Sequence, residues 1–287
     1  MNFKAELVAC FGQPVAENPT GVMQEAAFAA AGLNWRYLTI EVAPEGLGDA
    51  VRGARAMGWR GFNCTIPHKV AVIPFLDELS REARIIGAVN TVRREGNRLI
   101  GENTDGRGFF RGLTQDAGMD PKGKRVVLLG AGGAARAIAT ELLLAGVEDL
   151  VVVNRSSERA APMVDDLKQH GPIRFVPWRV SYEVSPETDL LVNATSLGLY
   201  PNVDWMPDVD LSRARCLVAD AVFNPPVTKF LAAAQARGLR TLDGLTMLVY
   251  QGVIGFEMWT GAKPDETVMK QTLLAVIRQS LLAAMVK

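Results

Sequence analysis

Short apolar runs alternate with stretches of helical spacing in the first part of the chain. The pattern predicts, in order, a strand at 4–10, a helix at 22–31, a strand at 35–42, a helix at 47–57 and a strand at 61–66. Glycine or proline follows both helices and the second strand, where such residues commonly end an element. This alternation is typical of βαβ units, so we predict a mainly parallel α/β domain.

A second apolar pattern begins at Arg125, where a strand of four apolar residues runs into a glycine cluster and then into an alanine-rich helix. Another apolar strand follows at 150–154. Glycines at such a turn let a pyrophosphate approach the backbone, and the helix N-terminus favours its negative charge. We therefore predict a Rossmann-like dinucleotide site whose contacts include Gly130, Ala131, Gly132, Gly133 and Ala134.

The residues after the second strand indicate which dinucleotide is bound. An NAD site usually has Asp or Glu here, but this chain has Asn154, Arg155, Ser156 and Arg159. Arginine forms forked, charge-assisted bonds to phosphate, so we expect the 2′-phosphate of NADP rather than NAD. An ordinary helix start, with a serine as N-cap and solvated arginines, explains the same residues, and both interpretations can hold together.

The rest of the chain completes a two-domain organisation. Further strands are predicted at 190–195 and 216–223, and long helices at 245–259 and 265–285. We predict a substrate-binding and catalytic domain at 1–106, a Rossmann-like NADP-binding domain at 107–242, and C-terminal helices at 243–287. We expect these helices to return to the first domain, with the site in the cleft between the domains.

Composition narrows the class of protein. The chain has 287 residues, 48% hydrophobic and 22% charged, with a formal net charge of zero, which gives no electrostatic case for nucleic-acid or membrane partners. Three widely spaced cysteines and the lack of a signal-like start lead us to expect a cytoplasmic protein. With only two histidines we expect no metal site. A monomer and a homodimer both remain open.

Three polar clusters lie where predicted apolar segments end, at 63–69, 87–91 and 101–106. Open α/β sheets place ligand-binding groups at such ends. Together with the glycine cluster and the segments Asn-Arg-Ser, Asn-Ala-Thr-Ser and Asp-Gly-x-x-Met-Leu-x-x-Gln, these clusters occur in one order along the chain. The set resembles the shikimate/quinate dehydrogenase family over nearly the whole sequence. The resemblance implies NADP-dependent interconversion of 3-dehydroshikimate and shikimate, with quinate or an aminoshikimate as alternative substrates.

The resemblance also assigns roles to residues. It makes Lys69 and Asp105 a catalytic pair, in which Lys69 exchanges the proton that hydride transfer to a ketone requires. We interpret the neighbouring His68 as structural. Amide and hydroxyl side chains suit a polyol ring, so the expected substrate-binding residues include Asn63, Thr65, Asn90 and Gln251. Residues expected near the nicotinamide are Thr195, Ser196, Val222 and Gly244.

One segment departs from the family pattern. The family usually holds the substrate carboxylate with two hydroxyls in His-Ser-x-Ser-Pro, whereas this chain has Glu17, Asn18, Pro19 and Thr20. Asn18 and Thr20 can still donate hydrogen bonds, but with different geometry, so we expect a divergent enzyme that acts on a cyclic hydroxy acid. Two other classes remain: an NADP-sensing protein without turnover, and an unrelated Rossmann oxidoreductase, which would leave the Lys69 and Asp105 clusters unexplained.

Overall fold

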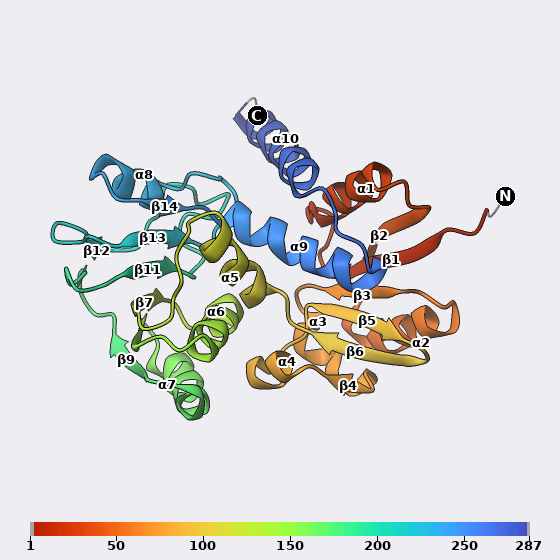
Figure 1. Ribbon diagram of the computed structural model, residues 1–287, viewed down its shortest axis with the longest axis horizontal. Coiled ribbons are helices and arrows are strands. Elements are labelled where there is room, and N and C mark those ends of the chain that lie inside the picture. The colour runs from red at the N-terminus through yellow and green to blue at the C-terminus, as the bar shows by residue number, and fades with distance from the viewer. Residues whose placement is uncertain (1–2, 286–287) are drawn as a thin grey trace. The chain divides into compact units, whose positions relative to one another are not determined.

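The computed structural model describes residues 3–285 of the chain, and side chains as far as Gln279 (Figure 1). The chain forms two compact units. Unit 1 consists of Met1–Thr104 and Gln251–Lys287, and unit 2 consists of Asp105–Tyr250. Each unit is an α/β structure built on its own six-stranded sheet, which confirms the predicted fold class. The exact domain limits given above stay a prediction.

The sheet of unit 1 has the strand order β2-β1-β3-β5-β6-β4. Its strands are β1 (Glu6–Gly12), β2 (Trp35–Glu41), β3 (Gly61–Cys64), β4 (Glu78–Leu79), β5 (Thr91–Glu95) and β6 (Arg98–Glu102). The helices are α1 (Thr20–Ala30), α2 (Leu47–Ala56), α3 (His68–Ala71), α4 (Arg81–Ile86), the end of α9 (Gly244–Thr260), α10 (Glu266–Met285) and the 3-10 turns Pro44–Gly46 and Ile73–Phe75. Strands β1, β2 and β3 are parallel, as predicted.

The antiparallel part of this sheet was not predicted. Strand β5 runs antiparallel to β3, and β5 and β6 form a hairpin that turns at Gly96 and Asn97. Gly96 has a φ of 60°, a left-handed conformation that glycine adopts without steric cost. The hairpin strands carry Arg93, Arg94 and Arg98, whose polarity hides the strand pattern when only apolar runs are followed.

Helices cover both faces of the sheet in unit 1. On one face, Leu47 and Val51 of α2 join a core cluster with Phe11 and Phe62. On the other face, Phe28 of α1 stacks on Phe256 of α9, with ring centroids 5.2 Å apart. The indole N–H of Trp259 also donates to the buried carbonyl oxygen of Val92, at 2.9 Å. The predicted return of the C-terminal segment to the first domain is therefore confirmed.

Unit 2 has the strand order β14-β13-β11-β7-β8-β9, and all the neighbouring pairs are parallel. The strands are β7 (Arg125–Leu129), β8 (Asp149–Asn154), β9 (Ile173–Pro177), β11 (Leu190–Asn193), β13 (Leu217–Asp220) and β14 (Thr241–Leu242), with a separate pair β10 (Tyr182–Glu183) and β12 (Val209–Asp210). The helices are α5 (Asp105–Gln115), α6 (Gly133–Leu144), α7 (Ser157–Leu167), α8 (Lys229–Ala236), the start of α9 and the 3-10 turn Lys168–His170. The first strand, β7, lies in the middle, so the strand order reverses beside it, as in Rossmann folds.

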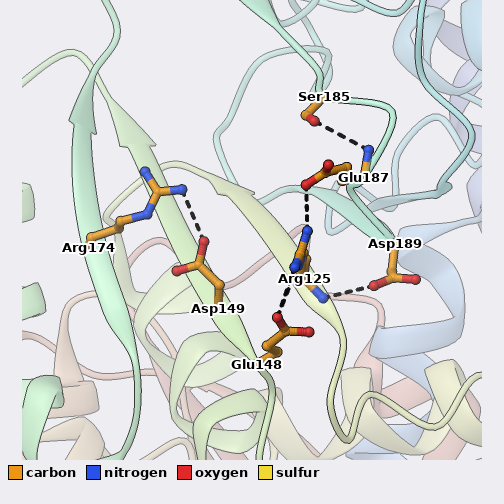
Figure 2. Close-up of polar contacts among 7 residues, drawn as sticks. All are labelled: Arg125, Glu148, Asp149, Arg174, Ser185, Glu187 and Asp189. Atoms are coloured by element: carbon orange, nitrogen blue, oxygen red, sulfur yellow. Dashed lines mark hydrogen bonds and ion pairs between the residues drawn. The ribbon is translucent and has the colours of Figure 1, made fainter.

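Ion pairs join the amino-terminal ends of this parallel sheet (Figure 2). The guanidinium of Arg125 pairs with Glu148 and Glu187, and the Arg125 backbone N–H donates to Asp189 at 2.9 Å. Such exposed pairs contribute at most about 1 kcal/mol each to stability. Within residues 3–285, no helix has the length and apolar character needed to cross a membrane.

Candidate active site

The glycine turn of unit 2 has the geometry that a diphosphate requires. Gly130 has a φ of 110°, and its N–H donates to the carbonyl of Val153 at 2.8 Å, which ties the turn to β8. A side chain at Gly130 would lie 2.9 Å from the carbonyl oxygen of Ala194. Gly132 and Gly133, at the start of α6, face open space, with no heavy atom within 4 Å of an added Cβ. Both glycines are exposed at a helix N-terminus, the kind of site that favours a negatively charged ligand.

Two exposed arginines, Arg155 and Arg159, follow β8. Neither side chain forms an ion pair or hydrogen bond within the described part of the chain. Ser156 accepts a hydrogen bond from the backbone N–H of Arg159 and caps α7, and Asn154 donates to the carbonyl of Ser156 at 2.8 Å. The helix-cap and phosphate interpretations therefore hold together: the serine caps the helix and the arginines remain available to an anion.

The residues expected beside the nicotinamide follow two other strands of the same sheet. Thr195 and Ser196 come directly after β11, and Val222 follows β13. Gly244 opens α9, and an added Cβ there would lie 2.3 Å from the carbonyl oxygen of Val222, so only glycine allows this approach. The predicted cofactor residues thus gather at the carboxyl ends of the parallel strands β7, β8, β11 and β13, where ligands bind in open α/β sheets.

In unit 1, a buried hydrogen-bond network holds the predicted substrate-binding amides. Asn63 donates to the carbonyl of Asn90 at 3.0 Å and to the hydroxyl of Thr91 at 2.9 Å. Its carbonyl oxygen accepts from the hydroxyl of Tyr37 at 2.6 Å. Asn90 in turn accepts from the backbone N–H of Thr104 at 2.7 Å. The network fixes both amides and the last residue before Asp105.

Tyr37, which donates to Asn63, also lies next to Cys10. Burial raises the pKa of Tyr37 well above its ordinary value, with a further contribution from Cys10, so its hydroxyl stays a donor to Asn63. Burial also raises the pKa of Cys10 to about 11, while the ammonium of Lys69 acts in the opposite direction. Thr65, on the loop after β3, is half-buried, and Gln251, in α9, is buried.

Lys69 and His68 lie in the short helix α3 but in different surroundings. His68 is fully buried, and its Nε2 lies 2.7 Å from the carbonyl oxygen of Val42. This contact supports a structural role. Lys69 is half-buried, and its carbonyl accepts from the N–H of Val89 at 2.7 Å, so its backbone is fixed to the second polar cluster.

Asp105 is the first residue of α5 and belongs to unit 2. It follows Thr104, which Asn90 holds in unit 1. The next residue, Gly106, is packed so closely on α6 that an added Cβ would lie 2.3 Å from the carbonyl oxygen of Ala137. Because Lys69 and Asp105 belong to different units, their pairing stays a prediction.

The segment that departs from the family pattern, residues 17–20, forms hydrogen bonds within unit 1. The side-chain oxygen of Asn18 accepts from the backbone N–H of Thr20 at 2.9 Å, and its amide nitrogen donates to the sulfur of Cys10 at 3.6 Å. Thr20 is buried as the first residue of α1. Within the described residues, one amide hydrogen of Asn18 and the hydroxyl of Thr20 have no hydrogen-bond acceptor, although Thr20 is buried. Glu17 is exposed beside them.

Several buried polar residues support these groups but were assigned no role from the sequence, although Thr91, Thr104 and Asn193 lie within the motifs described above. In unit 1 they are Tyr37, Thr91 and Thr104, and in unit 2 they are Asn193, Asp220 and Thr228. Asn193 and Asp220 end two neighbouring parallel strands. In the sequence, each is a polar residue that directly follows an apolar run, and this pattern could have indicated their supporting role.

A Rossmann sheet with an accessible glycine turn and a following arginine pair defines a dinucleotide-binding class of protein. Models of three protein families match the chain: the shikimate dehydrogenase substrate binding domain at residues 10–92, shikimate / quinate 5-dehydrogenase at 113–200, and the shikimate 5′-dehydrogenase C-terminal domain at 244–274. The chain belongs to the shikimate dehydrogenase family.

Individual relatives extend over nearly the whole chain. Shikimate dehydrogenase (NADP(+)) of Desulforamulus reducens is 42% identical over 279 residues, covering 95% of this chain and 96% of its own. The crystal structure of the ligand-free form of 5-ketofructose reductase of Gluconobacter sp. strain CHM43 is 47% identical, with a TM-score of 0.92 and coverage of 96% and 100%. Shikimate 5-dehydrogenase of Thermus thermophilus, in complex with NADP(H) and shikimate, is 36% identical, with a TM-score of 0.83 and coverage of 93% and 98%.

Proposed function

We propose that this chain is an NADP-dependent oxidoreductase that interconverts 3-dehydroshikimate and shikimate. The observation that carries the proposal is the presence, in one chain, of an open glycine turn followed by Arg155 and Arg159, and of a buried amide network beside Lys69. Full-length similarity to shikimate dehydrogenases, including one solved with NADP(H) and shikimate, supports the same activity.

In the proposed reduction, the residues of the chain would bind the substrate and supply a proton. When bound, NADPH supplies the hydride that adds to the carbonyl carbon, and the C=O double bond becomes a C–O single bond. The oxygen then needs one proton, which we assign to the ammonium of Lys69, with Asp105 orienting it. Asn63, Thr65, Asn90 and Gln251 would hold the ring hydroxyls, because amides and hydroxyls both donate and accept hydrogen bonds.

A second candidate activity is the reduction of a neutral keto sugar. It is favoured by the environment of Asn18, whose amide already binds Cys10 and Thr20, and by the 47% identity to a 5-ketofructose reductase. A substrate without a carboxylate would not need two hydroxyls at this segment, and it would not be repelled by Glu17. The rest of the substrate network suits either molecule, since both are polyols.

Parallel kinetics would separate the two candidates. The purified protein is assayed with NADPH against 3-dehydroshikimate and 5-ketofructose, and kcat/KM is compared. A preference of tenfold or more corresponds to about 1.4 kcal/mol in transition-state binding and identifies the substrate. If 3-dehydroshikimate is turned over more slowly than 5-ketofructose by that factor, the first candidate is replaced by the second.

Turnover also separates an enzyme from an NADP-sensing protein. Binding of NADP without reduction of either ketone by NADPH, and without oxidation of quinate or an aminoshikimate by NADP⁺, would favour the sensing class. We further propose that the protein is cytoplasmic and acts as a monomer or homodimer, and size-exclusion chromatography with light scattering would measure the oligomeric state.

A further inference from the structure

Asp220 is a buried carboxylate at the end of β13 that accepts three hydrogen bonds. The residue is 1% exposed. Oδ1 accepts from the side-chain amide of Asn193 and from the backbone N–H of Val222, both at 2.9 Å. Oδ2 accepts from the hydroxyl of Thr228 at 2.7 Å. Each of these three donors is neutral, so they stabilise the charge on this carboxylate as oriented dipoles.

These bonds join the two segments that we assign to the nicotinamide half of the cofactor site. Through Asn193, Asp220 holds the loop after β11, because the side-chain oxygen of Asn193 accepts from both the N–H and the hydroxyl of Thr195, at 3.1 and 2.7 Å. Through Val222, it holds the segment after β13, on which Gly244 packs. A single side chain therefore sets the spacing of both segments.

We propose that Asp220 is a positioning residue that shapes the nicotinamide half of the cofactor site, and that its ionised form holds this half in the binding conformation. The inference rests on the proposed NADP-dependent function. Asp220 ends β13, whereas the arginines that would bind the 2′-phosphate follow β8, so it should act on one end of the cofactor only.

The state of this carboxylate changes in an accessible pH range. Burial raises the pKa of Asp220 to about 7, opposed by the bonds from Thr228, Val222 and Asn193. Asp243 follows the neighbouring strand β14 and accepts from Thr246, while Lys229 on α8 pairs with Asp204 at 2.8 Å. Asp243 and Lys229 lie on or beside elements that adjoin β13, and Asp189 and Arg240 lie at the opposite, amino-terminal ends of the neighbouring strands. Below about pH 7 the protonated carboxyl can still accept hydrogen bonds but loses the charge that strengthens them.

The experiment compares NADP with its fragment 2′-phosphoadenosine 5′-diphosphoribose, which keeps the 2′-phosphate and the diphosphate but lacks the nicotinamide. Dissociation constants of both are measured by calorimetry on the full-length protein from about pH 5.5 to about pH 8.5. Titration of the shared 2′-phosphate affects both ligands and cancels in the ratio. As pH rises through 7, we expect the affinity for NADP to increase about three- to tenfold relative to the affinity for the fragment. This factor corresponds to the difference in strength between charged and neutral hydrogen bonds. A flat ratio would overturn the proposal.

A variant and a matched control complete the test. Asp220→Asn should behave at every pH like the protonated wild type: about three- to tenfold weaker NADP binding at pH 8 with unchanged fragment binding. Asp210→Asn is the control, since Asp210 also accepts a backbone N–H two residues on, from Ser212 at 2.8 Å, but on the surface. It should leave both constants unchanged.

The outcomes are distinguishable. Equal weakening of NADP and fragment in Asp220→Asn would mean that the residue only supports the fold of unit 2, and would overturn the proposal. If wild-type protein binds neither ligand, the NADP-dependent function itself fails, and the role of Asp220 with it. The wild-type pH series needs no variant, so it decides the matter even where Asp220→Asn does not fold.

Discussion

The preference for NADP over NAD should depend on Arg155 and Arg159. Both guanidiniums are exposed at the carboxyl end of β8, and neither has an ion-pair partner within the described residues. Replacing them with Ala therefore leaves no carboxylate in that part of the chain unpaired, and we expect little change in stability. Because NAD lacks the 2′-phosphate, only NADP should lose binding energy.

The magnitude follows from the contacts that would be lost. A hydrogen bond to a charged group is worth about 1.5–3 kcal/mol, and solvent exposure favours the lower end. Each substitution should thus weaken NADP about tenfold, and the double variant about a hundredfold, if the two contacts are independent. The loss should shrink as salt is added, because screening weakens exposed charge interactions.

The assay measures the dissociation constants of NADP and NAD for wild type, both single variants and the double variant. Arg174→Ala is a matched control: this arginine belongs to the same unit but pairs with Asp149 at 3.0 Å at the other end of the strands (Figure 2). It should leave the ratio of the two constants unchanged. Equal weakening of NADP and NAD in the double variant would refute the phosphate interpretation.

Three further predictions concern the other groups. Lys69→Ala should lower kcat by about 10²–10⁴ with NADP binding intact, and near-normal kcat with a raised KM would leave Lys69 as a binding group only. Thr20→Ala should raise the KM of a carboxylated ring substrate but not that of 5-ketofructose, and unchanged kinetics with both would place the carboxylate elsewhere. Gly61→Ala puts a Cβ 2.1 Å from the carbonyl oxygen of Val92, whereas Gly46→Ala meets no atom within 4 Å. In urea unfolding the first should cost more than about 3 kcal/mol and the second should stay within about 1 kcal/mol.

The cofactor half of the site could be predicted from local sequence because its geometry is local. A strand, a turn and a helix start occupy consecutive residues, so the glycine spacing alone places Gly130 at the turn and Gly132 at the N-cap of α6. The two arginines follow the next strand for the same reason. The parallel strands β1, β2 and β3 of unit 1 could be predicted from the sequence for the same reason, because each strand and the helix that follows it form one continuous segment.

The substrate half could be predicted only as a set of residue types. Asn63 stands out in its motif, but its partners Tyr37, Asn90 and Thr91 lie 26 or more residues away along the chain. No local sequence pattern shows that the hydroxyl of Tyr37 donates a hydrogen bond to the side-chain oxygen of Asn63. The role of Asp220 is hidden for the same reason, since Asn193 reaches it from the adjacent strand, 27 residues earlier.

The division of the chain also has a consequence for its synthesis. Unit 2 is one continuous segment, whereas unit 1 is closed by Gln251–Lys287. The aromatic contacts of Phe28 and Tyr37 with Phe256 and Trp259 cannot form until the last part of the polypeptide has left the ribosome. The Rossmann unit can therefore complete its folding first, while one face of the earlier-made strands β1–β6 is covered only in part, by α1. A nascent chain halted before residue 251 would leave the aromatic side chains of Phe28 and Tyr37 without these partners.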